Sequence, residues 1–402
     1  MKIGIYQSYW GAVGGGQRYV AVAAELLAQT HDVEIVHHRP DFDRAHFEEA
    51  MQVDLSRIGF RCIPALERPQ PSSRNPLARL RLEAEFGRDV SSPYELFINN
   101  SDTPPIFNHA GRGVLIVHFP LVSFDEFHAR NTPGWANRPA PVRYAADLYQ
   151  RREWRKRFET YDTYVANSQY GQQWVARRWG IRAEVLYPPL RQGLAPSAKL
   201  ATIVSIGAIR SEQHKKQSVL VDAFKRLCDE GLSGWRYIII GATGKSSEDR
   251  QALQDLRQAI EGYPIELRPD ASGADLKSTL ESASILWHSM GFGVDQEREP
   301  GRLEHFGMVA TEAMAAGCLP VAFNGGGLPE SVVHGETGWL WSTPDDLRRY
   351  TRAVADDAER REAMSRAAVA RAATFGTEAF RARFESLVAP LLREHAGRAS
   401  AR

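Results

Sequence analysis

The sequence predicts an α/β protein with two doubly wound parallel-sheet domains that face a central cleft, and three observations support this prediction. Short apolar runs alternate with helical segments along nearly all of the 402 residues. A proline-containing, loosely patterned break separates two such series near residues 188–199. A chain of this length is also expected to form two domains, each large enough to bury its own core.

The composition excludes several classes of protein. The formal net charge is +1, so no global charge points to nucleic acid as a partner. No apolar run approaches the roughly 20 residues that cross a bilayer, and the chain enters its first strand with no signal peptide. Cys62, Cys228 and Cys318 lack the paired spacings of zinc sites and disulfide frameworks. We therefore expect a cytoplasmic protein.

The first domain, residues 1–190, opens on a strand, a glycine-rich loop and a helix. The strand covers residues 2–6, the glycines fall within 11–16, and the apolar periodicity predicts a helix over 17–28. This order is similar to a dinucleotide-binding turn, but Tyr19 stands where the third glycine belongs. The second strand, 33–37, does not end on a ribose-binding acid. A dehydrogenase is therefore disfavoured.

Two features of the first domain are candidates for ligand binding. Gly15 and Gly16 form a backbone loop that we interpret as approaching a donor diphosphate or an acceptor, with a simple tight turn as the alternative. His118 directly follows a strand predicted over 113–117. The carboxyl end of a parallel strand faces the ligand crevice, and this position favours a functional histidine over a structural one.

Two further stretches of this domain are harder to assign. Residues 64–92, rich in Pro, Ser and Arg, are predicted to be an irregular insertion. Residues 142–159 are predicted to be a helix that mixes six basic residues with aromatic ones. Such a helix can bind an anionic membrane surface, but a solvated helix that packs its aromatic residues inward is the favoured interpretation. If the acceptor is lipid-linked, this helix is the first candidate for a side facing the inner leaflet of the membrane.

Helix-capping residues, a helix-ending glycine and two prolines predict the domain boundary. A strand over 163–166 leads through Ser168, a good helix cap, into a helix over 169–179 that Gly180 ends. Two prolines and the loose segment 191–199 then form an interdomain linker. The second domain is expected over residues 200–374.

Cations follow the first strand of this second domain. The strand covers 201–207, and Arg210 and the segment 214–217, which contains two lysines, come before a helix that runs to Leu227. Cations at a helix N-terminus are mildly unfavourable against the helix dipole. Their placement therefore indicates an anionic ligand. A diphosphate suits an arginine and a lysine side chain together.

Two acidic residues bracket the start of an Ala-rich helix in the second domain. Glu304 precedes the helix, Glu312 lies inside it, and Gly317 ends it. The apolar runs 283–287 and 319–323 on either side are predicted to be parallel strands. The helix start therefore lies at the carboxyl edge of a sheet, where open α/β proteins bind ligands.

This helix start has the groups that a nucleotide sugar requires. Unpaired amides at a helix start bind anions, and here they belong to Phe306, Gly307, Met308 and Val309. With about 1.5 Å of rise per residue, Glu304 and Glu312 are about 12 Å apart along the axis. We expect Glu304 to reach sugar hydroxyls and Glu312 the ribose hydroxyls. If only the two glutamates are considered, a simpler interpretation is favoured, in which the helix dipole stabilises an acidic residue at the helix N-terminus and the other glutamate is solvated.

The segment from Glu304 to Gly317, with 324–330 and 335–340, resembles the signature of the family-four retaining glycosyltransferases, the glycosyl transferases group 1. This resemblance implies the GT-B fold of two Rossmann-like domains, with a C-terminal helix, 375–394, that crosses back to the first. It implies the sugar and ribose roles of Glu304 and Glu312, a glycine pair at Gly15-Gly16 and a sugar contact for His118. It also implies that Arg210 and Lys216 hold the leaving diphosphate, with Lys215 as a rival one residue away.

The resemblance further implies a hexosyltransferase that retains the anomeric configuration and uses no metal or other cofactor. The start Glu-His-Phe-Gly looks like that of mannosyltransferases, so GDP-mannose is the predicted donor, with a UDP-sugar as the alternative. The acceptor is a glycan, a lipid-linked sugar or a small molecule. A nucleotide-sugar epimerase, a sugar phosphorylase and a non-catalytic nucleotide-sugar sensor remain alternatives. A two-carboxylate glycosidase is disfavoured because Glu304 and Glu312 are too far apart.

Overall fold

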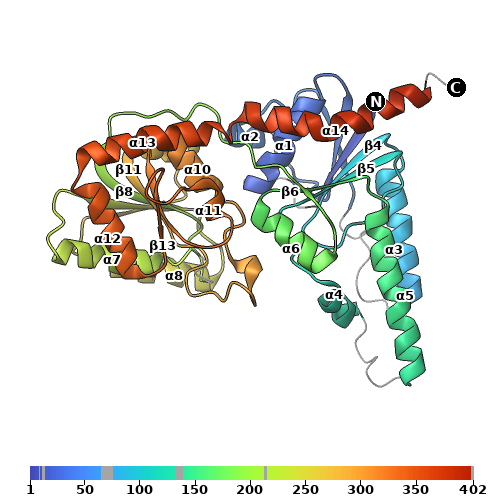
Figure 1. Ribbon diagram of the computed structural model, residues 1–402, viewed down its shortest axis with the longest axis horizontal. Helices are drawn as coiled ribbons and strands as arrows, with labels where there is room; N and C mark the ends of the chain where they lie inside the picture. Colours follow the sequence, from blue (N-terminus) through green and yellow to red (C-terminus); the bar gives the residue numbers. More distant parts are fainter. Residues whose placement is uncertain (9, 11–13, 65–75, 132–138, 212–214, 400–402) are drawn as a thin grey trace. The chain divides into compact units, whose positions relative to one another are not determined.

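The computed structural model describes the 402 residues except 9, 11–13, 65–75, 132–138, 212–214 and 400–402. The chain divides into two compact units. One contains Met1–Pro189 together with Phe380–Arg402, and the other contains Leu190–Ala379. Each unit has its own parallel sheet with helices packed against it (Figure 1).

The sheet of the first unit has seven strands in the order β3-β2-β1-β4-β5-β6-β7, and every neighbouring pair is parallel. The strands are β1 (Lys2–Gln7), β2 (Asp32–His37), β3 (Ile58–Cys62), β4 (Leu96–Asn100), β5 (Arg112–Val117), β6 (Thr163–Ala166) and β7 (Glu184–Val185). The strand order reverses between β1 and β4. In sheets of this kind that reversal marks the ligand-binding crevice.

Alternate residues of the central strands enter two different cores. In β4, Leu96 and Ile98 belong to one apolar cluster while Phe97, between them, belongs to the other. Helices α1 (Gly15–Leu27) and α14 (Thr377–Ala399) supply the first cluster, and α3 (Pro76–Ser91), α5 (Ala140–Glu159) and α6 (Gln169–Trp179) supply the second. Because both faces are covered, the strands have few polar residues.

Helix α6 agrees with the sequence prediction and α3 does not. Ser168 caps α6 by accepting a hydrogen bond from the Gly171 amide, and Gly180 ends it in the left-handed conformation. The prediction of an irregular insertion is wrong for Pro76–Ser91, which forms a 16-residue helix. Phe86 and Val90 of this helix are buried in the second cluster. The composition of 64–92 misled the prediction because the Pro- and Ser-rich part, 65–75, outweighed the helix-forming residues that follow it. Residues 65–75 themselves lie outside the described residues.

The sheet of the second unit has six parallel strands in the order β10-β9-β8-β11-β12-β13. Its strands are β8 (Leu200–Ile206), β9 (Arg236–Gly241), β10 (Ile265–Pro269), β11 (Ala283–His288), β12 (Leu319–Phe323) and β13 (Trp339–Trp341). The strands predicted around the acidic pair are thus neighbours, with Ile285 opposite Leu319.

Helices connect these strands. They are α7 (Gln217–Asp229), α8 (Ser247–Ala259), α9 (Gly273–Ser282), the 3-10 turn η3 (Pro300–Arg302), α10 (Met308–Ala315), α11 (Leu328–Ser331), α12 (Pro344–Ala355) and α13 (Ala358–Ala373). The first unit also contains the short helices α2 (Arg44–Met51) and α4 (Phe124–Asn131). The predicted fold class, two doubly wound parallel-sheet domains, is confirmed. Over the described part of the chain, no helix has the length and apolar character that crossing a bilayer requires.

Candidate functional site

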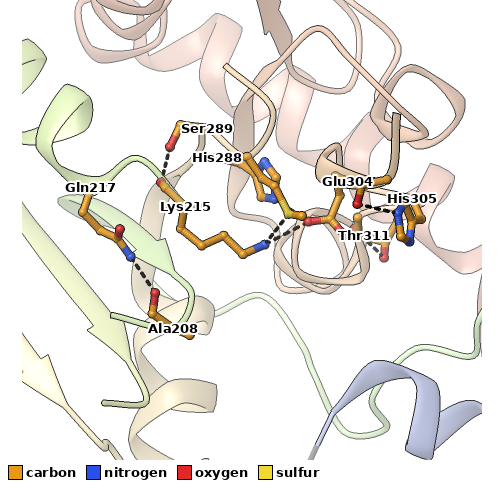
Figure 2. A network of polar contacts seen from close by, with 11 residues as sticks. Ala208, Lys215, Gln217, His288, Ser289, Glu304, His305 and Thr311 are labelled. Atoms are coloured by element: carbon orange, nitrogen blue, oxygen red, sulfur yellow. Dashed lines mark hydrogen bonds and ion pairs between the residues drawn. The ribbon is translucent and has the colours of Figure 1, made fainter. Parts of the chain in front are cut away.

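The candidate site of the second unit is centred on the Glu304 carboxylate. Glu304 lies between η3 and α10. Its Oε2 atom is 3.0 Å from Nζ of Lys215 and 3.0 Å from Nε2 of His288. Figure 2 shows these three side chains together. Lys215 precedes α7, and His288 is the last residue of β11. Three segments distant in sequence therefore meet on one oxygen atom at the carboxyl edge of the sheet.

The charges of this group are set by burial and by one another. Burial alone would raise the pKa of the Glu304 carboxyl, but the Lys215 ammonium and the hydrogen bond from His288 lower that pKa well below its ordinary value. Burial lowers the pKa of His288, although its hydrogen bond to Glu304 opposes the shift. His288 is only 4% exposed. The arrangement is thus a carboxylate held by an ammonium and a neutral imidazole.

The segment that follows β11 also holds Lys215. Ser289 donates a hydrogen bond from its hydroxyl to the Lys215 carbonyl, at 2.6 Å, and Met290 places its sulfur 3.2 Å from the lysine Nζ (Figure 2). Lys216 instead has φ +47 and ψ +42 and stands at the start of α7. Of the two lysines that the sequence left as rivals, the structure brings Lys215 to Glu304.

Two of the three glycines after β12 brace the Glu304 backbone. The Gly327 amide donates to the Glu304 carbonyl at 2.8 Å. Gly326 has φ +61, and a Cβ atom there would collide with the same carbonyl oxygen. The sequence Asn324-Gly325-Gly326-Gly327 thus has a physical purpose, because only a residue without a side chain fits this close backbone approach.

The start of α10 offers amides for an anion. Gly307 precedes the helix with φ +96, and no side chain caps it. Within the described residues, the amides of Gly307, Met308 and Val309 donate to no carbonyl or side chain. Phe306 is 2% exposed and packs against Phe375, with the ring centroids 5.4 Å apart. Its side chain therefore belongs to the core, and only its backbone could take part in the predicted anion binding.

Glu312 lies closer to the helix start than predicted. Helix α10 begins only at Met308, so Glu312 is the fifth helical residue and lies little more than one turn inside. The separation of about 12 Å from Glu304 assumed helical rise from Glu304 onward, and this assumption is wrong. The Glu312 residue is 8% exposed. Its role at the ribose stays a prediction.

Arg210 is not brought to the acidic group. It is exposed and lines a groove along α7 and α8 with Asp222 and Asp255. It forms no ion pair with any residue that the structure describes. Its contact with a diphosphate stays a prediction, and His214 of the same loop lies outside the described residues.

In the first unit, the structure brings Gly16 and His118 together. Gly15 and Gly16 are the first residues of α1, and a Cβ atom on Gly16 would lie 3.3 Å from the His118 Nε2. The His118 ring stands edge-on to Tyr19, with centroids 5.2 Å apart. Its Nε2 is buried and has no partner among the described residues. Burial lowers the pKa of His118, although Asp102 partly opposes this shift.

Two residues at the sheet edges were missed by the sequence analysis. Asp102 accepts hydrogen bonds from the amides of His118 and Phe119, at 2.8 and 3.0 Å, and thereby fixes the turn after β5. His288 had a readable signal, because it directly follows the strand predicted over 283–287, just as His118 follows the strand predicted over 113–117. Asp102 had none, since its partners lie sixteen and seventeen residues further along the chain.

Comparisons with known proteins show what the chain is similar to. Residues 188–371 match the family model described as glycosyl transferases group 1. The GDP-Man:Man(3)GlcNAc(2)-PP-Dol alpha-1,2-mannosyltransferase of Dictyostelium discoideum is 25% identical over 235 residues, which are 54% of this chain and 44% of the relative. The D-inositol 3-phosphate glycosyltransferase of Streptomyces avermitilis is 30% identical over 181 residues, 43% of this chain and 37% of the relative. The chain thus spans less than half the length of these relatives.

Solved structures share the fold over nearly the whole chain. HepE of Anabaena, in complex with UDP and glucose, superposes with a TM-score of 0.67 at 15% identity and covers 97% of this chain and 100% of its own. The lipopolysaccharide outer core galactosyltransferase WaaB, in its apo form, gives a TM-score of 0.64 at 15% identity, covering 96% and 99%. The segment 188–371, which contains Lys215, His288 and Glu304, is thus similar to the glycosyl transferases group 1, and the two α/β units of the chain have the GT-B fold.

Proposed function

We propose that the chain transfers a hexose from a nucleoside diphosphate sugar to an acceptor with retention of the anomeric configuration. One observation carries this proposal: the Glu304 carboxylate, held by Lys215 and His288, lies just before a helix whose first amides donate to no residue in the described part of the chain. A carboxylate suits sugar hydroxyls, and an ammonium beside free helix amides suits a diphosphate. Both halves of the donor thus have complementary groups within a few residues of each other.

The proposed chemistry is assistance to the leaving diphosphate. The sugar–phosphate bond breaks through an oxocarbenium-like state, and negative charge grows on the departing oxygen. Lys215, Arg210 and the amides near Gly307 stabilise that charge, at about 3 to 4 kcal/mol for a well-placed donor. The acceptor hydroxyl attacks from the same face as the leaving group, its oxygen forms the new bond, and its proton goes to a diphosphate oxygen. No covalent intermediate with the enzyme is required.

The remaining side chains bind and orient in this proposal. Glu304 positions the sugar through its hydroxyls, Glu312 binds the ribose, and His118 contacts the transferred sugar from the first unit. We assign the diphosphate to Lys215 in preference to Lys216, because the Lys215 ammonium already lies 3.0 Å from Glu304. A bound diphosphate then competes with Glu304 for this ammonium, which leaves the carboxylate available for the sugar.

GDP-mannose is the proposed donor. The name of the Dictyostelium discoideum relative contains GDP-Man, whereas the Anabaena structure holds UDP and glucose, so a UDP-sugar is the competing choice. The proposed acceptor is a glycan, a lipid-linked sugar or a small molecule, and the proposed location is the cytoplasm. The diphosphate charge is met by cations and amides, so we propose that no metal is needed and that EDTA leaves the rate unchanged.

A binding screen followed by a transfer assay tests the proposal. Thermal melting with GDP, UDP and their sugars should show stabilisation by one nucleotide at least. Incubation of that donor with candidate acceptors should release the nucleoside diphosphate and give a product with the donor's anomeric configuration, read by proton NMR. Conversion of the sugar without an acceptor would instead identify an epimerase, and stabilisation without turnover on any acceptor would identify a sensor. No stabilisation by any nucleotide would overturn the proposal.

A further inference from the structure

The N-terminal half of α5 does not pack against the protein. Tyr144 is 72% exposed, Leu148 is 55% exposed, and Val142 is 47% exposed. Inward packing begins at Gln150, which is 4% exposed, and continues with Trp154 and Phe158, which are both 5% exposed. The prediction that this helix packs its aromatic residues inward is therefore correct for its C-terminal half and wrong for its N-terminal half.

Four of the exposed residues form one stripe along the helix. Tyr144, Leu148 and Arg152 follow at intervals of four, and Arg155 continues the same face one turn later. Buried Trp154 precedes Arg155 and therefore lies about 100° around the helix axis from it. We call these four residues the α5 stripe. It is apolar toward the start of the helix and cationic toward its end, and the helix extends beyond the sheet of the first unit in Figure 1.

The cationic part of the stripe has no ion-pair partner among the described residues. Arg152 and Arg155 are exposed and form no ion pair there. Two of the three acidic residues on the helix are engaged elsewhere, because Asp147 pairs with Arg151 at 2.9 Å and Glu153 pairs with Lys156 at 3.0 Å. The third, Glu159, is the last residue of the helix and is exposed. Helix α5 has six basic and three acidic residues in all. The stripe therefore presents net positive charge beside exposed apolar side chains.

We propose that the α5 stripe docks on an anionic phospholipid surface. Tyr144 and Leu148 enter the boundary between headgroups and acyl chains, and Arg152 and Arg155 bind lipid phosphates. A second copy of the chain fits less well, since it would bring an equally basic face against this one. The inference goes beyond the proposed function and stands whether or not the chain transfers sugars.

Vesicle co-sedimentation without donor or acceptor tests the charge of the stripe. The full chain should bind phosphatidylcholine vesicles that contain phosphatidylglycerol, bind phosphatidylcholine alone far more weakly, and lose binding in salt. Each cation near such a surface contributes about fivefold to partitioning. The double variant Arg152→Glu/Arg155→Glu should therefore partition about 30-fold more weakly or worse. The variant Arg257→Glu/Arg366→Glu makes the same charge change at exposed arginines of the second unit and should bind like the unmodified chain.

A second pair of variants tests the apolar part. Tyr144→Gln/Leu148→Gln should weaken binding even in low salt, whereas Leu200→Gln, at a site of comparable exposure (47%) in the second unit, should not. All variants are first melted to confirm folding. Absence of binding by the unmodified chain, or equal losses in the control variants, would overturn the proposal. So would concentration-dependent dimerisation that the Gln variants abolish, because that result would assign the stripe to a second copy.

Discussion

The carboxyl edges of the two sheets hold histidines in different circumstances. In the second unit, one Glu304 oxygen lies 3.0 Å from both the His288 imidazole and the Lys215 ammonium. In the first unit, the His118 ring lies edge-on to Tyr19 and close to Gly16, and no charged side chain holds it among the described residues. Each imidazole has one buried nitrogen without a partner in the described part of the chain, Nδ1 of His288 and Nε2 of His118. The difference is that the other nitrogen of His288 is tied to a carboxylate.

This difference has an energetic meaning. Groups that share one carboxylate are coupled, so removal of one leaves the others with an unpaired buried charge or dipole. An isolated buried nitrogen has a desolvation cost that a ligand is able to recover. We therefore expect large and non-additive effects of mutation in the second unit, and small and separable effects in the first.

The lysine pair tests which ammonium matters. Lys215→Met should lower kcat about 10²- to 10³-fold, because the diphosphate loses a charged donor in the transition state. Lys216→Met removes an ammonium but keeps a side chain of similar length. It should change kcat less than about threefold, because the backbone of Lys216 forms the start of α7. The measurement is nucleotide release from GDP-mannose or the donor chosen by melting. Equal losses in both variants would contradict the assignment.

The glycine brace tests how strongly the Glu304 backbone is fixed. Gly326→Ala should lower the free energy of unfolding by about 3 kcal/mol, because its Cβ meets the Glu304 carbonyl and its φ is +61. Gly293→Ala, with φ +75 and open space around its Cβ, should lose only about 1 kcal/mol. Thermal melting of both variants measures the difference. If the two variants melt alike, close packing against Glu304 contributes nothing beyond backbone strain.

The two glutamates separate transfer from binding. Glu304→Gln should slow transfer about 10- to 50-fold with little change in nucleotide affinity, since it weakens a charge-assisted contact to the sugar. Glu312→Gln should chiefly weaken the binding of the free nucleotide. Calorimetry with the nucleotide and steady-state kinetics give the two readouts. Near-normal values for both variants would remove these roles.

The low pKa of Glu304 gives the ion pair a defined pH window. A carboxyl whose pKa is lowered by folding stabilises the protein above its unfolded pKa, which is about 4.3, and loses that contribution as the pH falls through the folded value. In Lys215→Met, burial of Glu304 is no longer offset by the ammonium. The melting difference between the unmodified chain and this variant should be a few degrees near neutral pH, equivalent to about 1 to 2 kcal/mol, and should shrink below about pH 4. A difference that is constant from neutral to acidic pH would exclude the pair as its source.

The sequence predicted most of the fold because local signals set it. The α6 boundaries followed from Ser168 and Gly180, whose capping chemistry is independent of the rest of the chain. Helix α3 was lost because its charged residues lie next to a Pro- and Ser-rich stretch. The outward half of α5 was misread because periodicity reports which residues share a helix face and not whether the protein covers that face.

Site residues were predictable where their position at a strand end or helix start places them in the site. They were not predictable where the local backbone conformation decides which side chain reaches it. Glu304, His118 and the start of α10 follow from strand ends and a helix start. The choice between Lys215 and Lys216 depends on a left-handed residue at Lys216, which no local pattern indicates. Asp102 depends on a meeting of two loops, and such non-local contacts leave no trace in either loop.

The smallest effect concerns Gly16, and it separates function from stability in the first unit. Gly16→Ala replaces glycine in the first turn of α1, so helix propensity should leave the protein equally stable or more stable by about 0.5 kcal/mol. Its Cβ would lie 3.3 Å from the His118 Nε2, which is tight enough to shift the imidazole by a few tenths of an ångström. We expect transfer to fall about threefold with no loss of melting temperature. His118→Asn should abolish this sensitivity, so that Gly16→Ala has no further effect in the double variant. Additive losses in the double variant would show instead that Gly16 acts through its backbone, as the helix start near Gly307 is proposed to do, and the contrast between the two units would then disappear.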